Sequence, residues 1–167
     1  VIDQAILVSC DLCVIRPGIQ DGFRRHVAPR LKDFDIQKLL LAATHTHAAP
    51  VLLQDRYESY DGAMEPNDYV MFMNHQIADA VVKAWQGRTK GQVAWGLGHA
   101  VVGCNRRAIF DNGKGVMYGK TNAPDFRHVE GYEDHSLDIL CCFDAQETLT
   151  AAVIAVPCPS QSVRGSR

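Results

Sequence analysis

The architecture of the chain can be predicted outward from one stretch, Leu39-Leu40-Leu41-Ala42-Ala43-Thr44-His45-Thr46-His47-Ala48-Ala49-Pro50. The first five of them are apolar, which is the length and composition expected of a buried β-strand. Pro50 ends regular structure, because proline has no backbone N–H group and a fixed φ angle. The segment therefore predicts a strand that carries two histidines, His45 and His47, at its carboxyl end.

These two histidines have the spacing of a site presented by a strand. In an extended backbone, residues i and i+2 point to the same side, so His45 and His47 are expected to face one pocket. One imidazole can then bind a metal ion while the other transfers a proton. The alternative is a pair of surface loop histidines that bond to backbone carbonyls. The apolar strand in front of the pair favours the functional interpretation.

Composition places the chain among ordinary globular proteins. It has 167 residues, of which 47% are hydrophobic and 22% are charged, so it is long enough for one domain with a sizeable core. The net charge of −2 and the absence of a block of Lys and Arg argue against a nucleic-acid partner. No stretch approaches the roughly 18 consecutive apolar residues of a membrane span, and the chain is expected to be soluble.

The cysteines fit neither a zinc ribbon nor a dense disulfide scaffold, because there is a single C-x-x-C motif among them. Cys10 and Cys13 form that motif at the end of an apolar run, and we interpret both as buried strand residues rather than as a metal site. The remaining cysteines are Cys104, Cys141, Cys142 and Cys158.

The first part of the chain predicts a strand, a helix and a second strand. Residues 5–15 are almost continuously apolar, and Asp11 within them is either tied to a backbone turn or part of a polar site. Apolar residues recur at helical spacing over about 18–33, with Pro29 as a kink or break. The strand 38–43 follows. In such a crossover unit, ligands gather at the carboxyl ends of the strands, where the histidine pair falls.

The rest of the chain predicts one more helix and then strands. The polar loop 51–68 is either a substrate-gating segment or a plain surface excursion. A helix over about 69–86 is expected to be capped by Asn67 or Asp68 and to end at Gly87. Its inward residues are expected to be Phe72, Ile77, Ala80, Val81 and Ala84.

The order of these elements predicts an α/β fold with a mixed, largely buried β-sheet flanked by helices. Strands are expected over 92–104, 137–143 and 149–156, and Asn112-Gly113 indicates a hairpin turn. An amidohydrolase barrel also places a His-x-His at a strand end. The later strands follow one another without helices between them, which breaks the alternation that a barrel requires.

Four landmarks in the same order resemble the neutral ceramidase family, the neutral/alkaline non-lysosomal type. They are Val8-Ser9-x-Asp11-Leu12, Thr44-His45-Thr46-His47 followed by Pro50, Asn105-Arg106 after a glycine-rich strand, and an x-Pro pair at Cys158-Pro159. The resemblance covers nearly the whole chain but only the first part of the family's catalytic domain. It implies that residues 1–167 are a single domain, a fragment of that longer catalytic domain.

The resemblance implies a zinc-dependent hydrolase that cleaves the N-acyl bond of ceramide. His45 is similar to a zinc ligand of the family, His47 to its proton-transfer residue, and Arg106 to the residue that holds the substrate near the scissile amide. The implied partner is a lipid amide substrate, with contact to a membrane surface, no nucleic acid, and a secreted or periplasmic location.

This sequence departs from the family at two positions. Cys158 precedes the proline where the family has its second zinc histidine. Either its thiolate replaces that histidine as a zinc ligand, or this subgroup has lost the ceramidase reaction. Arg107-Ala108 stands where the family has Ser-Pro after Asn-Arg, which bears on the choice of substrate. The remaining zinc ligands of the family would lie beyond Arg167. The alternatives are a metal-dependent hydrolase of another amide or ester, and a non-catalytic binding domain that kept the fold.

Overall fold

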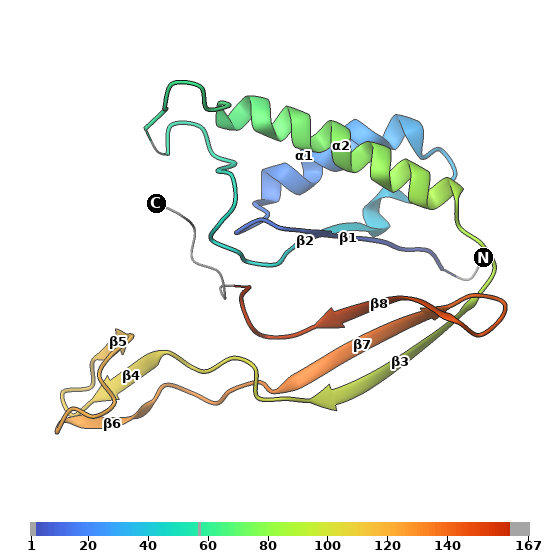
Figure 1. The fold of residues 1–167 in the computed structure, drawn as a ribbon. Helices are drawn as coiled ribbons and strands as arrows, with labels where there is room; N and C mark the ends of the chain where they lie inside the picture. Colours follow the sequence, from blue (N-terminus) through green and yellow to red (C-terminus); the bar gives the residue numbers. More distant parts are fainter. Residues whose placement is uncertain (1–2, 57, 161–167) are drawn as a thin grey trace. The chain divides into compact units, whose positions relative to one another are not determined.

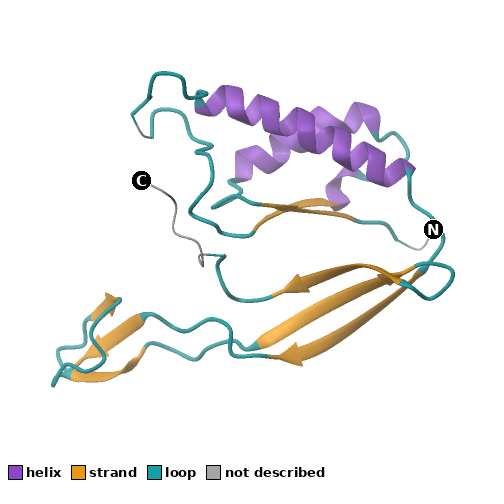
Figure 2. Cartoon of the chain, in the orientation of Figure 1, coloured by secondary structure: helices purple, strands orange, loops and turns teal. Residues whose placement is uncertain are grey.

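The computed structural model describes residues 3–56 and 58–160, which divide into two compact units. Unit 1 is the chain up to Arg88 together with Pro159 and Ser160, and unit 2 is Thr89–Cys158. The expected mixed α/β class is confirmed, because the described residues contain helices as well as parallel and antiparallel sheets (Figure 2). The assignment of the whole chain to one longer catalytic domain stays a prediction.

Unit 1 contains the predicted strand, helix, strand and helix in that order. They are β1 (Ile6–Cys10), α1 (Pro17–Val27), β2 (Leu39–Ala43) and α2 (Pro66–Gln86) (Figure 1). Strands β1 and β2 pair in parallel, from Ile6 opposite Leu39 to Cys10 opposite Ala43. Their carboxyl ends therefore lie at the same edge, as the sequence predicts for a crossover unit.

The core of unit 1 lies between this strand pair and the two helices. Phe23, Val27 and Leu39 are fully buried at its centre. The other buried members of the cluster are Cys10, Leu12, Leu31, Phe34, Leu41, Met73, Ala78, Val81 and Val82. Among the residues expected to face inward from the second helix, Val81 is buried and Ile77 is partly buried against the core, whereas Phe72, Ala80 and Ala84 are exposed. The buried face of α2 is thus rotated from the predicted one.

Both helices end where proline or glycine requires it. Helix α1 stops at Val27, and Pro29 lies in the short 3-10 helix η1 (Ala28–Arg30), so the predicted break is confirmed. Helix α2 ends at Gly87, whose N–H donates to the carbonyl of Lys83 at 2.9 Å. The predicted cap at Asn67 or Asp68 is wrong. Pro66 occupies the first helical position, which its fixed φ favours, and this makes Glu65 the N-cap residue.

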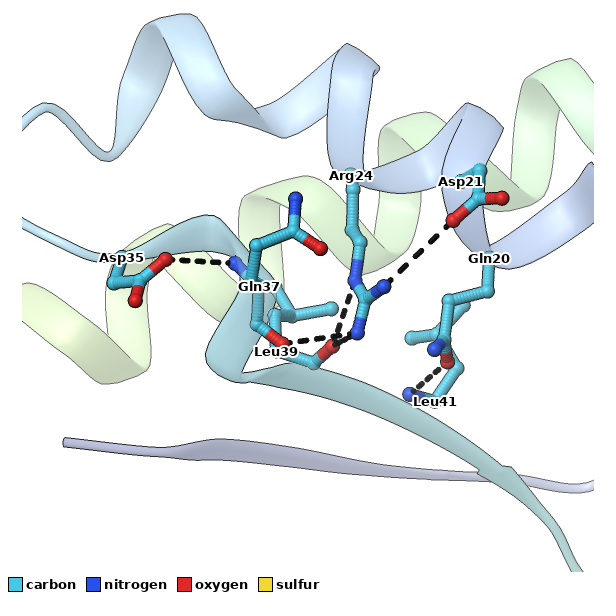
Figure 3. Close-up of polar contacts among 7 residues, drawn as sticks. All are labelled: Gln20, Asp21, Arg24, Asp35, Gln37, Leu39 and Leu41. Atoms are coloured by element: carbon cyan, nitrogen blue, oxygen red, sulfur yellow. Dashed lines mark hydrogen bonds and ion pairs between the residues drawn. The ribbon is translucent and has the colours of Figure 1, made fainter.

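Side chains from α1 cover the edge of β2 that is not paired with β1 (Figure 3). The guanidinium of Arg24 donates from Nε and Nη2 to the carbonyl of Leu39, at 3.1 and 2.8 Å, and from Nη2 to the carbonyl of Gln37 at 3.0 Å. The Gln20 amide oxygen accepts from the Leu41 N–H at 3.0 Å. These side chains satisfy the backbone groups that a third strand would otherwise bond.

A short 3-10 helix, η2 (Ile36–Lys38), leads directly into β2. Its N-cap is Asp35, whose carboxylate accepts the backbone N–H of Gln37 at 3.1 Å. The cap satisfies one of the N–H groups that a helix start leaves without a partner. The chain therefore enters β2 from an ordered turn.

Unit 2 consists of two antiparallel sheets. In the first, β7 (Ser136–Phe143) lies between β3 (Gln92–His99) and β8 (Leu149–Ala155). In the second, β4 (Arg107–Phe110) lies between β5 (Gly115–Met117) and β6 (Phe126–Val129). The predicted turn at Asn112-Gly113 is confirmed: it joins β4 to β5, and Gly113 has a φ of +74°.

The prediction of one largely buried sheet is wrong for the residues that the structure describes. The strands form three separate sheets, and β3 and β8 are exposed along almost their whole lengths. The physical reason is that antiparallel strands pair with near neighbours through short turns and need no crossover back to the first sheet. In residues 3–56 and 58–160, no helix is both long and apolar enough to cross a membrane.

Candidate metal site

The candidate site lies where β1 and β2 end. The backbone N–H of Thr44 donates to the carbonyl of Cys10 at 3.0 Å, which continues the strand pairing by one residue. The Thr44 hydroxyl donates to a carboxylate oxygen of Asp11 at 3.1 Å. Of the two roles expected for Asp11, the structure supports the one in a polar site. These bonds fix the chain on both sides of the edge from which His45 projects.

His45 is held in a defined tautomer by a backbone carbonyl that lies just beyond the end of β1. Its Nδ1 lies 2.7 Å from the carbonyl oxygen of Cys13. A carbonyl can only accept a hydrogen bond, so in the neutral imidazole Nδ1 carries the hydrogen and Nε2 keeps its lone pair. This is the arrangement that commonly orients a metal-binding histidine.

His47 faces the same point as His45. The Nε2 atoms of the two rings lie 3.4 Å apart, and the rings are inclined at 65°. That separation is longer than a usual N–H hydrogen bond of about 2.7–3.2 Å. Two nitrogens bound to one tetrahedral zinc ion at about 2.0–2.1 Å would lie about 3.3–3.4 Å apart. The ring positions thus fit two ligands of a single ion.

Cys13 adds a sulfur to this pair. Ligand atoms of Cys13, His45 and His47 all lie within 4.8 Å of one another, and the Cys13 side chain is a half-buried thiol. This group can hold a metal ion. The interpretation of Cys13 as a buried strand residue is therefore wrong, because β1 ends at Cys10 and the chain turns before it reaches Cys13.

The other cysteine of the C-x-x-C motif has the structural role that the sequence predicts. Cys10 is the last residue of β1 and belongs to the core of unit 1. Burial raises the pKa of its thiol above the ordinary value, and the charge of Asp11 adds to this effect. A raised pKa keeps the thiol protonated, which opposes metal binding. The two cysteines of the motif thus have separate roles.

Arg106 and Cys158 belong to unit 2. The Arg106 guanidinium donates from Nη1 to the hydroxyl of Tyr118 at 2.6 Å and lies 5.0 Å from the centre of the Tyr118 ring. The backbone N–H of Cys158 donates to the carbonyl of Val156 at 2.8 Å. The roles expected of Arg106 in substrate binding and of Cys158 as a zinc ligand stay predictions.

A pocket of about 440 Å³ opens beside the candidate metal site. Cys13 and His47 line it, and so do the side chains of Arg16 and Arg56. The rest of its wall is apolar: Val14, Ala49, Pro50, Val51, Leu52 and Leu53. Residues 51–56 belong to the loop for which the sequence predicts either a gating or a plain surface role. In the structure this part of the loop forms a wall of the pocket.

Comparison of the chain with protein-family models, with curated proteins and with solved structures finds no match. The resemblance to neutral ceramidases therefore stays a hypothesis that rests on the four sequence landmarks.

Proposed function

We propose that the protein is a zinc-dependent hydrolase of an amide bond and that Cys13, His45 and His47 form its metal centre. The observation that carries the proposal is the convergence of one thiol and two imidazoles at the carboxyl ends of two parallel strands. Ligands of open α/β folds bind at such ends. Cys13 and the histidine pair come from two segments more than thirty positions apart, so local sequence alone does not account for their meeting.

The donor set favours zinc. Sulfur and imidazole nitrogen are its preferred ligands, and hard cations such as magnesium prefer oxygen. Catalytic zinc sites have three protein ligands and one open position, whereas structural sites have four protein ligands. When bound, zinc would polarise the scissile carbonyl and lower the pKa of a water molecule to about 7.

The protein residues around the group have roles of their own. The Cys13 carbonyl orients the His45 ring, and the contact between Thr44 and Asp11 holds the strand end beside it. His47 can serve in either of two ways. As a third ligand its Nε2 would bind the metal and could not exchange a proton with the substrate, and as the residue expected from the resemblance it would pass a proton to the leaving nitrogen. The metal content of a variant separates these roles.

The resemblance supports ceramide or a related lipid amide as the substrate, with Arg106 near the scissile bond. The two alternatives from the sequence remain part of the test. A hydrolase of another amide or ester would bind zinc and cleave a different substrate. A binding domain that kept the fold would bind no zinc.

The first experiment is to measure zinc by elemental mass spectrometry on the purified full-length protein. We expect about one zinc ion per chain. The variants Cys13→Ser and His45→Ala should lose it, and the matched control Cys104→Ser, at an exposed cysteine of unit 2, should keep it. His47→Ala should lose zinc if His47 is a ligand, and should keep zinc but lose activity if it transfers a proton.

Two further measurements complete the test. Loss of zinc from Cys158→Ser would establish the ligand that the resemblance implies. Substitution of cobalt for zinc should give a thiolate-to-metal charge-transfer band in the near ultraviolet that Cys13→Ser abolishes. Absence of zinc from the parent protein would refute the proposal, and so would failure of the zinc-loaded protein to cleave N-acylsphingosine and simpler fatty amides.

A further inference from the structure

We infer that the pocket beside the metal group binds the head group of an amide substrate that carries a negative charge, with Arg16 and Arg56 as the residues that recognise it. This inference rests on the proposed function and specifies its substrate class. The proposed substrate is an acyl amide whose amine half bears an anion such as a carboxylate. The head group of a neutral ceramide has only uncharged hydroxyl groups with which these arginines could form hydrogen bonds.

The charges of the pocket support an anion. Arg16 and Arg56 are its charged lining residues, and no Asp or Glu of the described chain lines it. Neither guanidinium makes an ion pair or a hydrogen bond with the residues 3–56 and 58–160. Arginines that only stabilise the fold usually bond to a carboxylate or a carbonyl, as Arg24 does in the same unit. Within the part of the chain that the structure describes, the donors of these two arginines are therefore open to a ligand.

The metal group adds to the positive charge. A divalent ion with one thiolate has a net charge of about +1, and two arginines raise the total beside the pocket to about +3. A guanidinium presents donors in a planar fork that matches the two oxygens of a carboxylate. A substrate anion would reduce this charge, whereas a neutral or cationic head group would not.

The position of the pocket allows the same substrate to reach the metal group. Cys13 and His47 belong both to that group and to the pocket wall, so a molecule in the pocket lies next to the site of chemistry. The wall also has apolar residues, which include Leu52 and Leu53, and these can pack against the hydrocarbon part of the substrate. A volume of about 440 Å³ lies in the usual range for small-molecule sites.

A second pocket, of about 820 Å³, differs in charge. It shares Arg56 with the first, but its lining includes the carboxylates of Asp55, Glu58 and Glu65. Hydrogen bonds from the side chains of Gln54 and Ser59 lower the pKa of Glu65, which keeps it negative. Carboxylates repel an anion, so the anionic group is assigned to the first pocket, beside Arg16.

The reaction that follows from this assignment is ordinary amide hydrolysis. Water supplies the oxygen of a new C–O bond to the acyl carbon, and the amide C–N bond breaks. The leaving nitrogen takes a proton, so the products are a fatty acid and the amine that carries the anion. No oxidant, reductant or additional reactant is required.

The test compares two substrates that differ in one group. N-dodecanoylglycine carries a carboxylate, and N-dodecanoylethanolamine has a hydroxyl in its place, with the same chain and the same amide. With the zinc-loaded full-length protein, kcat/KM should be about ten- to a hundredfold higher for the glycine conjugate, as expected for charge-assisted hydrogen bonds. Phosphorylated N-dodecanoylethanolamine tests whether phosphate is recognised instead of carboxylate.

Arginine variants link that preference to the pocket. Arg16→Gln and Arg56→Gln should each lower the ratio of kcat/KM for the charged and neutral substrates by about tenfold. The matched control Arg25→Gln, at an exposed residue of α1 that does not line the pocket, should leave the ratio unchanged. Thermal unfolding of all three variants checks that they fold like the parent.

The outcomes separate this inference from the proposed function. If N-acylsphingosine or the ethanolamide is cleaved without preference for a charged amide, the inference is wrong and the hydrolase remains. If no amide is cleaved, the hydrolase is wrong, and calorimetric titration with N-dodecanoylglycine then decides the inference. Loss of binding in Arg16→Gln and Arg56→Gln would support the anion site. Binding of unchanged affinity in both variants, or no binding to the parent protein, would refute it.

Discussion

Replacing Arg24 by methionine should destabilise unit 1 by loosening the strand that leads to the candidate site. Arginine and methionine have similar helix propensities, so the change leaves α1 intact and removes the donors that its guanidinium offers. The Arg24 side chain is only 17% exposed, and Leu39, which accepts two of its bonds, is fully buried. Water cannot readily replace the lost donors at that carbonyl.

The magnitude follows from these contacts. A hydrogen bond from a charged donor to a buried acceptor contributes about 1.5–3 kcal/mol. The bond to the Gln37 carbonyl is exposed and adds little. The ion pair with Asp21 is 3.7 Å long and its carboxylate is 60% exposed, so it adds less than about 1 kcal/mol. We therefore expect Arg24→Met to lower the free energy of unfolding of this unit by about 2 kcal/mol.

Hydrogen exchange measures this locally. A loss of about 2 kcal/mol corresponds to about thirtyfold more frequent opening, which should appear as faster exchange of the amides over residues 36–46. Arg25→Met is the matched control, since Arg25 is exposed one position along the same helix and its loss should cost less than about 0.5 kcal/mol. Equal exchange rates in the two variants would refute the argument that Arg24 substitutes for a neighbouring strand.

Two other predictions concern titration and reactivity. The pKa of Glu133 is lowered because its carboxylate accepts the backbone N–H of Asn105 and bonds to His135. The ionised Glu133 side chain therefore stabilises the fold fully above the ordinary glutamate pKa of about 4.3. This stabilisation is lost as the pH falls through the lower pKa of the folded state. The urea midpoint should fall less steeply on acidification in Glu133→Gln, and an unchanged slope would contradict this. Iodoacetamide should modify Cys10 much more slowly than the exposed Cys104, since burial raises its thiol pKa, and peptide mass spectrometry that found equal rates would refute its place in the core.

The elements of unit 1 could be predicted from the sequence because local residues dictate them. Pro29 cannot continue a helix, and Gly87 is a common residue just beyond a helix end, so both boundaries follow from single residues. The orientation of α2 could not be predicted in this way. Residues 70–73 are all apolar, so their pattern does not distinguish the buried Met73 from the exposed Phe72.

The meeting of the two histidines was predicted for a reason that the structure does not support. Side chains at i and i+2 share a side only where the backbone is extended, but His45 has a φ of +60°, in the left-handed region. Few residues other than glycine adopt this conformation, although histidine does so more often than most. No single-sequence pattern indicates it. The rings meet because the Cys13 carbonyl holds His45 and because the turned backbone brings His47 toward it.

Cys13, by contrast, could have been found from the sequence by applying one rule to both strands. The carboxyl ends of parallel strands lie at one edge, and Cys10 pairs with Ala43. Cys13 follows the end of the first strand by three residues, as His45 follows the end of the second by two, so both project from that edge. The rule that places the histidines at this edge therefore places Cys13 there too, separately from Cys10. A metal ligand set in such a fold should therefore be sought across the ends of paired strands before it is sought within one motif.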